Sequence, residues 1–276
     1  VSAIVPTGST VEKAFLYSSL WSFTGPLPAP TVDFDGTTYS PGDFIALGSY
    51  QPQAASFPNR YIGAYLTDVT SQVAGKIGGG SAAPFSFAVN SENPNANIDG
   101  EVLAIVYSNP TSPESTIGFL DGFSESTGDS TTIALANPIT AADLADPDFL
   151  AQMSLGIGFS LAGTQSSQVD VNGTRLTSAA GGYDDGILAN GGLLTVGGIG
   201  DSDDNPANPN LSPSDTRYDD ELYSLLPFLA VGTDTIQIDT LNPSLDDNIF
   251  FLGLNITAEA DINPNPIPGP LLLIGT

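Results

Sequence analysis

The sequence predicts an all-β protein of two β-sandwich, jelly-roll-like domains with one or two short helices. Three observations predict this class. Thirty glycines and 22 prolines interrupt the 276 residues every few positions, which leaves little room for long helices. Short runs rich in Val, Ile, Phe, Tyr and Thr recur between these turn clusters, as in sandwiches and jelly rolls. Hydrophobic residues make up 41% of the chain, which is enough for a sizeable core.

The individual elements follow from local pattern. Strand-like segments are residues 13–23, 85–89, 101–108, 115–123, 132–136, 155–163, 193–199, 235–240 and 249–260. Helical pieces are expected at 141–152 and 218–228. The second helix would have acidic residues in its first turn, as the helix dipole favours, and Pro227 near its end.

Three pairs of segments indicate an internal duplication. VDFDGTTYS from Val32 resembles VDVNGTRLT from Val169, an offset of 169 − 32 = 137 residues. The segments from Arg60 and Arg217 match at an offset of 217 − 60 = 157. FAVNSENPNANIDGEVLAIVYS (87–108) matches IQIDTLNPSLDDNIFFLGLNIT (236–257) at an offset of 236 − 87 = 149. The pairs occur in the same order, although repetitive β sequence also produces such matches.

The duplication predicts three parts of the chain. Residues 1–142 would form a first sandwich and residues 143–262 a second, acid-rich one. Residues 263–276 would form a proline-rich spacer and an apolar terminal segment.

Charge and composition exclude several classes of function. With 5 basic and 31 acidic residues the net charge is −26, which repels nucleic acid and attracts cations. The chain has no histidine and no cysteine, which excludes Ser-His-Asp and Cys-His catalysis, thiolate zinc sites and disulfides. We therefore expect no enzyme. A glycoside hydrolase that uses two carboxylates is the less favoured alternative. Sugar-binding sites normally use exposed aromatic side chains, but the single tryptophan, Trp21, lies in a strand-like run and is expected in the core.

Acidic clusters in the second half predict a Ca²⁺ site, because calcium takes several carboxylate, amide and carbonyl oxygens. Asp201, Asp203 and Asn205 have a D-x-D-x-N spacing, but Pro206 stands where an EF-hand needs glycine. The alternative is that these acids form turns and keep the protein soluble. The candidate ligands are Asp184, Asp185, Asp201, Asp203, Asn205, Asp219, Asp220, Glu221, Asp246 and Asp247.

The two ends of the chain suggest export and assembly. The spacer NPNPIPGP precedes four apolar residues, Leu271, Leu272, Leu273 and Ile274. This tail could fold back on its own domain, belong to a sorting segment, or add as a strand to a neighbouring subunit. A stiff, extended spacer makes strand addition geometrically easy. The start at Val1 without methionine is interpreted as a processed, exported form, and no apolar stretch is long enough to span a membrane.

The segment from Val169 to Leu254, with its string DDELY…PF…NPSLDDNIF, resembles a domain of secreted bacterial surface proteins. These are proteins of the PEP-CTERM (exosortase-sorted) type and large adhesin-like proteins. The tail NPIPGPLLLIGT is similar to the start of a PEP-CTERM signal, but lacks Pro-Glu-Pro, a spanning length and closing arginines. The resemblance implies an exported cell-surface or matrix protein without a particular activity.

These observations predict a secreted structural or adhesive protein of a cell surface or extracellular matrix. It would be stabilised by calcium and assemble with copies of itself into filaments by terminal-strand exchange. Glycans or other surface proteins are further expected partners. The alternative is a lectin-like, carbohydrate-binding adhesin, with Tyr183, Tyr218 and Tyr223 as exposed aromatics beside a calcium loop.

Overall fold

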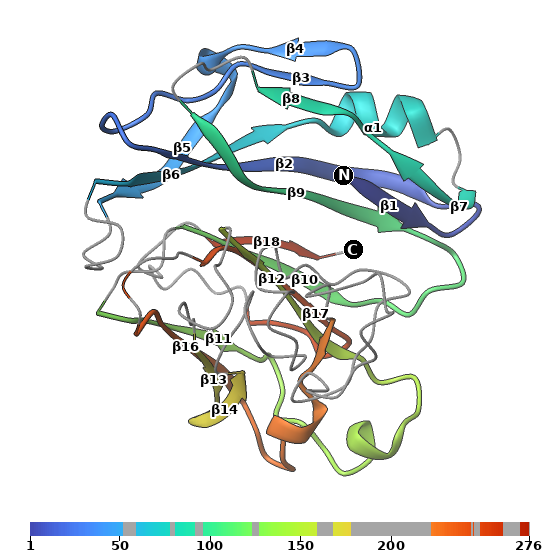
Figure 1. The fold of residues 1–276 in the computed structure, drawn as a ribbon. Helices are drawn as coiled ribbons and strands as arrows, with labels where there is room; N and C mark the ends of the chain where they lie inside the picture. The colour runs from blue at the N-terminus through green and yellow to red at the C-terminus, as the bar shows by residue number, and fades with distance from the viewer. Residues whose placement is uncertain are drawn as a thin grey trace, which may run out of the picture. The chain divides into compact units, whose positions relative to one another are not determined.

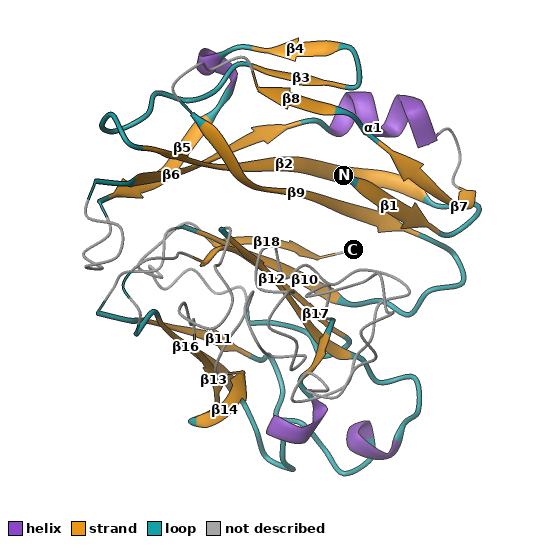
Figure 2. Cartoon of the chain, viewed as in Figure 1, coloured by secondary structure: helices purple, strands orange, loops and turns teal. Residues whose placement is uncertain are grey.

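The computed structural model describes residues 1–51, 59–77, 81–91, 96–122, 127–158, 168–177, 222–243, 245, 249–261 and 271–275. Within these residues the chain is all-β, with antiparallel strands, three 3-10 turns and one α-helix, α1 (Thr70–Ile77) (Figure 2). The predicted all-β class is therefore confirmed. The chain divides into two compact units, Val1–Ser112 (unit 1) and Pro113–Thr276 (unit 2). The described residues hold no helix of the length and hydropathy that a membrane crossing requires.

Unit 1 stacks small sheets on a larger one (Figure 1). The larger sheet has the order β5-β6-β2-β9, and the smaller sheets are β4-β3-β8 and β1-β7. Its strands are β1 (Ser2–Val5), β2 (Thr10–Ser22), β3 (Val32–Phe34), β4 (Thr37–Tyr39), β5 (Ile45–Tyr50), β6 (Tyr61–Asp68), β7 (Ser81–Ser86), β8 (Val89–Ser91) and β9 (Asn97–Ser108), with a 3-10 turn at Pro41–Asp43.

The core of unit 1 includes residues from β2, β3 and α1. Leu16 and Phe34 are fully buried in one cluster with Val73 of the helix. The ring of Phe34 stacks on Phe87 with centroids 4.7 Å apart. Burial of each such side chain stabilises the fold by about 1.5–3 kcal/mol.

Helix α1 follows from a local signal. The carboxylate of Asp68 accepts a hydrogen bond from the Thr70 N–H at 2.9 Å, which satisfies a donor at the start of the helix. Val69, Val73 and Ile77 are buried and recur every four residues, so they lie on one face.

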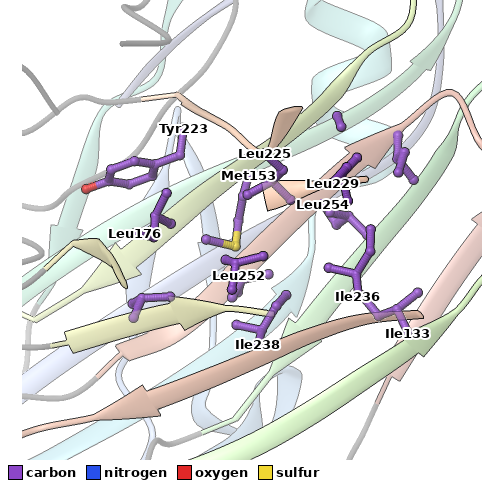
Figure 3. Packing of buried hydrophobic residues seen from close by; sticks show 14 of the residues in the cluster. Ile133, Met153, Leu176, Tyr223, Leu225, Leu229, Ile236, Ile238, Leu252 and Leu254 are labelled. Carbon is purple, nitrogen blue, oxygen red and sulfur yellow. The ribbon is translucent and has the colours of Figure 1, made fainter. Parts of the chain in front are cut away.

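Unit 2 is a sandwich of two sheets, β15-β12-β17-β10-β18 and β11-β16-β13-β14. Side chains such as Met153 and Leu252 of the first sheet meet Ile236 and Ile238 of the second in the core (Figure 3). The strands are β10 (Thr116–Asp121), β11 (Asp129–Ala134), β12 (Ala151–Ile157), β13 (Gln168–Val171), β14 (Thr174–Thr177), β15 (Tyr223–Ser224), β16 (Thr235–Leu241), β17 (Ile249–Ile256) and β18 (Leu271–Gly275), with 3-10 turns at Asp143–Ala145 and Leu226–Phe228.

The same hairpin occurs in both units. Asp35 and Gly36 connect β3 to β4 with φ angles of 51° and 81°, and Asn172 and Gly173 connect β13 to β14 with 50° and 73°. Two successive positive φ angles are typical of type I′ turns, which Asp-Gly and Asn-Gly favour. The two sequences that match at an offset of 137 therefore fold alike.

The strand that pairs with each hairpin also has the same register. Val32 pairs with Ser91, and Val169 pairs with Thr240. These pairs are related by the two sequence offsets, 137 for the hairpin and 149 for its partner strand. The backbone N–H of Asp35 donates to Ala88 O, and that of Asn172 to Gln237 O, both at 2.9 Å.

The sheet that contains β2 and β9 in unit 1 also corresponds to the sheet that contains β12 and β17 in unit 2. Leu16 of β2 pairs with Leu103 of β9, while Leu155 of β12 pairs with Leu252 of β17, and 252 − 103 is again 149. The duplication stays a prediction, and these shared registers support it.

The division between the units differs from the predicted boundary at 142/143. It falls at Ser112/Pro113, because β10 and β11 pair with β17 and β16 of the second unit. The terminal segment is not separate either, since β18 pairs with β10 inside unit 2.

Neither predicted helix forms as such in the described residues. Between 141 and 152 there is only the 3-10 turn Asp143–Ala145, and β12 begins at Ala151. In the second segment, 218–221 lie outside the described residues, and Tyr223–Ser224 is a strand. Pro147 and Pro227 lack the N–H that a continuing helix needs. The predicted strand at 193–199 also lies outside the described residues.

Candidate functional site

The predicted calcium ligands all lie outside the described residues. They are Asp184, Asp185, Asp201, Asp203, Asn205, Asp219, Asp220, Glu221, Asp246 and Asp247. Within the part of the chain that the structure describes, no three acidic side chains come together in a group that could hold a metal ion. The calcium site therefore stays a prediction from the sequence.

The predicted assembly residues, Leu271 to Ile274, form strand β18 together with Gly275. β18 pairs antiparallel with β10, from Leu120 opposite Leu271 to Thr116 opposite Gly275. It is the last strand of the five-stranded sheet.

The chain is anchored shortly before β18. The Asp261 N–H donates to the carbonyl of Ala134 at 2.9 Å, and Ala260 forms a bridge with Leu135. Residues 262–270 connect this anchor to β18 and contain four prolines.

Strand β10, by contrast, is held firmly from its other side. It pairs with β17 over its full length, Thr116–Asp121 against residues 256–251. The ring of Phe119 also lies against Phe251, with centroids 5.4 Å apart. β10 therefore presents a fixed edge, and β18 is the short terminal strand that covers it.

A second candidate is a polar pocket of about 390 Å³ on the four-stranded sheet of unit 2. Ser130, Asp239, Asp170 and Arg175 are directly paired neighbours in one row across its four strands. Other residues that line the pocket are Thr127, Gly128, Asp129, Gln168, Thr240 and Leu241.

Two carboxylates lie side by side in this row, which is unfavourable unless each has a partner. Arg175 donates to Asp170 through Nε and, at 3.5 Å, through Nη2. The amide of Gln237 donates to both oxygens of Asp239 at 2.9 Å. Donors of the chain itself thus balance the row, and carboxylate and guanidinium groups line the pocket.

Unit 1 has a simpler version of this row. The sequence offsets relate Asp170 to Asp33, Asp239 to Asn90 and Arg175 to Thr38. Both Asn90 and Thr38 pair with Asp33. Compared with unit 1, the row in unit 2 therefore has one more carboxylate and one guanidinium. The fold does not require these two groups, because unit 1 has the same strand pairing without them.

A buried carboxyl in unit 1 was not predicted from the sequence. Glu101 of β9 accepts a hydrogen bond from Ser18 Oγ of β2 at 2.7 Å. Its other oxygen, Oε1, is fully covered and has no hydrogen-bond partner among the described residues. Burial raises the pKa of Glu101 to about 8, against the opposing effects of the Ser18 hydrogen bond and the terminal amino group.

The match between segments 87–108 and 236–257 supplies a signal that could have identified Glu101. The offset of 149 aligns it with Phe250, which is 1% exposed. A carboxyl at a position that is apolar in the matching segment indicates a buried acid.

One of the three aromatics expected for a lectin is buried rather than exposed. Tyr223 is 0% exposed and belongs to the core of unit 2, so it cannot form a sugar platform; Tyr183 and Tyr218 lie outside the described residues. Phe23, which is 60% exposed, instead packs edge-on against Trp21. The guanidinium of Arg60 lies over Trp21 at 4.5 Å and occupies that ring face.

A scan against protein-family models, a search of curated proteins and a search of solved structures found no match to this chain. Function has to be inferred from the residues and their geometry.

Proposed function

We propose that this chain is a secreted, non-enzymatic structural protein of a cell surface or extracellular matrix. Copies of it assemble by exchange of strand β18. The observation that carries the proposal is that the C-terminal apolar segment forms an edge strand whose one neighbour among the described strands is β10.

Exchange needs no new kind of contact. β18 of one copy would pair with β10 of the next in the register that it has within its own unit, and the proline-rich connection would carry it across. Because the donor strand and the acceptor edge are different surfaces, successive exchanges give an open filament when the rotation between copies does not close a ring.

The composition supports an extracellular setting. A net charge of −26 makes copies repel one another, and this repulsion is weakened by salt. Contacts through uncharged strands suit such a protein. The resemblance of the segment from Val169 to Leu254 to bacterial surface proteins points in the same direction.

A disulfide lock tests strand exchange. Ile117 and Ile274 are directly paired in β10 and β18, and the chain has no native cysteine. In the variant Ile117→Cys/Ile274→Cys, oxidation of dilute protein should give an intrachain disulfide and no covalent multimers. Oxidation after concentration should give a ladder of covalent multimers, measured by gel electrophoresis without reductant and by light scattering.

The single variant Ile117→Cys controls for the substitution and should give no ladder. Filaments that form equally well from the intrachain-locked protein would show that β18 does not exchange.

Calcium stabilisation is proposed from the acidic clusters of the second half. A ligand at 100 times its Kd stabilises the folded state by about 2.7 kcal/mol, which corresponds to a rise of roughly 5–10 °C in Tm for a chain of this size. We expect this rise with millimolar Ca²⁺ relative to EGTA in a thermal-shift assay, and its loss in Asp201→Asn/Asp203→Asn. An unchanged Tm in the parent protein would exclude a stabilising calcium site.

A further inference from the structure

Strand β9 is a long edge strand with one partner among the described strands. It ends the sheet β5-β6-β2-β9 and has 12 residues, about twice the usual strand length of 5–6. No strand among the described residues pairs with its outer side. Such an edge presents unpaired N–H and C=O groups that another strand can use.

Unit 2 shows what the fold places on this edge. β17 corresponds to β9 through the offset of 149, and the outer side of β17 pairs with β10 over residues 251–256. Subtraction of 149 gives Val102–Tyr107 as the matching stretch of β9. In unit 2 this stretch carries an antiparallel strand, whereas in unit 1 it carries none from the described residues.

The charge pattern of β9 marks the same stretch. Residues 102–108 read VLAIVYS and contain neither a charged residue nor a proline, while Asp99 and Glu101 precede them. Two copies with a net charge of −26 each can approach closely only where carboxylates do not face one another.

We propose that β9 pairs antiparallel with β9 of a second copy, with Ile105 at the centre of the contact. This register places Val102 opposite Ser108 of the second copy, and it places Asp99 and Glu101 beyond the end of the facing strand. The β5-β6-β2-β9 sheets of the two copies become one continuous sheet across a two-fold axis. The interface is closed, because the same surface is used on both copies.

The occupant is a second β9 rather than a second β18. β18 has five residues and is already paired with β10, whereas the edge of β9 is present on every copy and matches itself in length. The dimer therefore requires no strand to leave its own unit. It goes beyond strand exchange and does not depend on it.

A single cysteine at the centre of the contact tests the dimer. Directly opposite residues in antiparallel strands have Cβ atoms about 4.5–5.5 Å apart. Oxidation of the full-length variant Ile105→Cys at micromolar concentration should therefore link most of the protein into dimers. The matched control is Leu254→Cys, the corresponding position in β17, whose edge is covered by β10; it should cross-link at least tenfold more slowly.

Hydrogen exchange of the unmodified protein gives a second readout that no variant can disturb. Amides of 102–108 should exchange several-fold more slowly as concentration rises, while those of β10 stay unchanged. Equal cross-linking of the two variants, together with concentration-independent exchange in β9, would overturn the proposal. A mixed disulfide between Ile105→Cys and Gly275→Cys chains, formed in place of the Ile105→Cys dimer, would overturn it in favour of β18.

The test of the β9 dimer can be distinguished from the test of β18 exchange. Protein locked by the Ile117→Cys/Ile274→Cys disulfide should still form the β9 dimer in light scattering and should go no further.

Discussion

Replacement of Glu101 by glutamine is expected to raise the free energy of unfolding at pH 9 by on the order of 4 kcal/mol. The cause is the burial of the carboxyl between β9 and β2, where Ser18 is its hydrogen-bond donor and Oε1 has no partner among the described residues. An ionised group in this position lacks the solvation that it has in the unfolded chain. Glutamine keeps the shape and an acceptor for Ser18, and it carries no charge.

The direction of the pH dependence follows from the raised pKa. The pKa of Glu101 is about 8 in the folded protein, against an ordinary value of 4.5. Between these values the folded state holds a proton that the unfolded state has released, so stability falls as pH rises. The contribution is fully present below about pH 4.5 and is lost as pH passes 8. The variant should lack this fall and should differ little from the parent at pH 4.

Urea denaturation from pH 4 to 9 measures the effect, and Glu12→Gln is the matched control. Glu12 also accepts a serine hydroxyl across the β2–β9 pair, from Ser108 Oγ at 2.6 Å, but it is exposed. The control should retain the fall in stability of the parent. If Glu101→Gln and the parent lose stability in parallel between pH 5 and 9, the carboxyl is ionised in the folded state at neutral pH.

An inward-facing acid on an edge strand also has a physical use. Addition of another strand over Glu101 would bury the carboxyl further, and natural sheets use such charges to limit edge pairing. In β9 the acid precedes the uncharged stretch 102–108, so it sets the end of the surface that a second copy can use. Phe250, the matching residue in unit 2, lies at the corresponding end of the β17 stretch that β10 covers.

Local sequence was sufficient to predict several of the strands, and it matched the two segments that form the hairpins. Asp35-Gly36 and Asn172-Gly173 are turn pairs with strong backbone preferences, and the apolar runs of β2, β9 and β17 were recognised because period and composition act over a few residues. The offset of 149 also agrees with the shared registers, since a pairing that both units share leaves both strands displaced by the same number of residues.

Tertiary pairing decided what local sequence could not. The chain divides at Ser112/Pro113 rather than at 142/143, because β10 and β11 pair with β17 and β16, and only this pairing assigns them to unit 2. Helix α1 was missed because eight residues give a weak periodic signal, and Val69, Val73 and Ile77 could equally come from a strand. For the tail, the apolar composition is compatible with a strand that adds to the edge of a sheet. The pairing with β10 depends on which sheet edge the fold leaves open.

The shared registers lead to a second large effect, which concerns stability. Leu16 and Leu155 occupy corresponding positions and are both 0% exposed. Leu16→Ala and Leu155→Ala should each lower the free energy of unfolding by about 3 kcal/mol, since buried leucine-to-alanine changes cost 2–5 kcal/mol. The two losses should agree within about 1 kcal/mol and add in the double variant, because each leucine belongs to a separate core cluster.

Urea denaturation can assign each loss to its unit. The single tryptophan, Trp21, lies in unit 1, so its fluorescence follows that unit, while circular dichroism follows both. Leu16→Ala should shift the fluorescence transition, and the exposed control Leu226→Ala should shift neither signal by more than a few tenths of a kcal/mol. A loss above 3 kcal/mol for one buried leucine and below 1 kcal/mol for the other would mean that the two positions are packed differently. The matching registers would then reflect common strand geometry rather than a duplicated core.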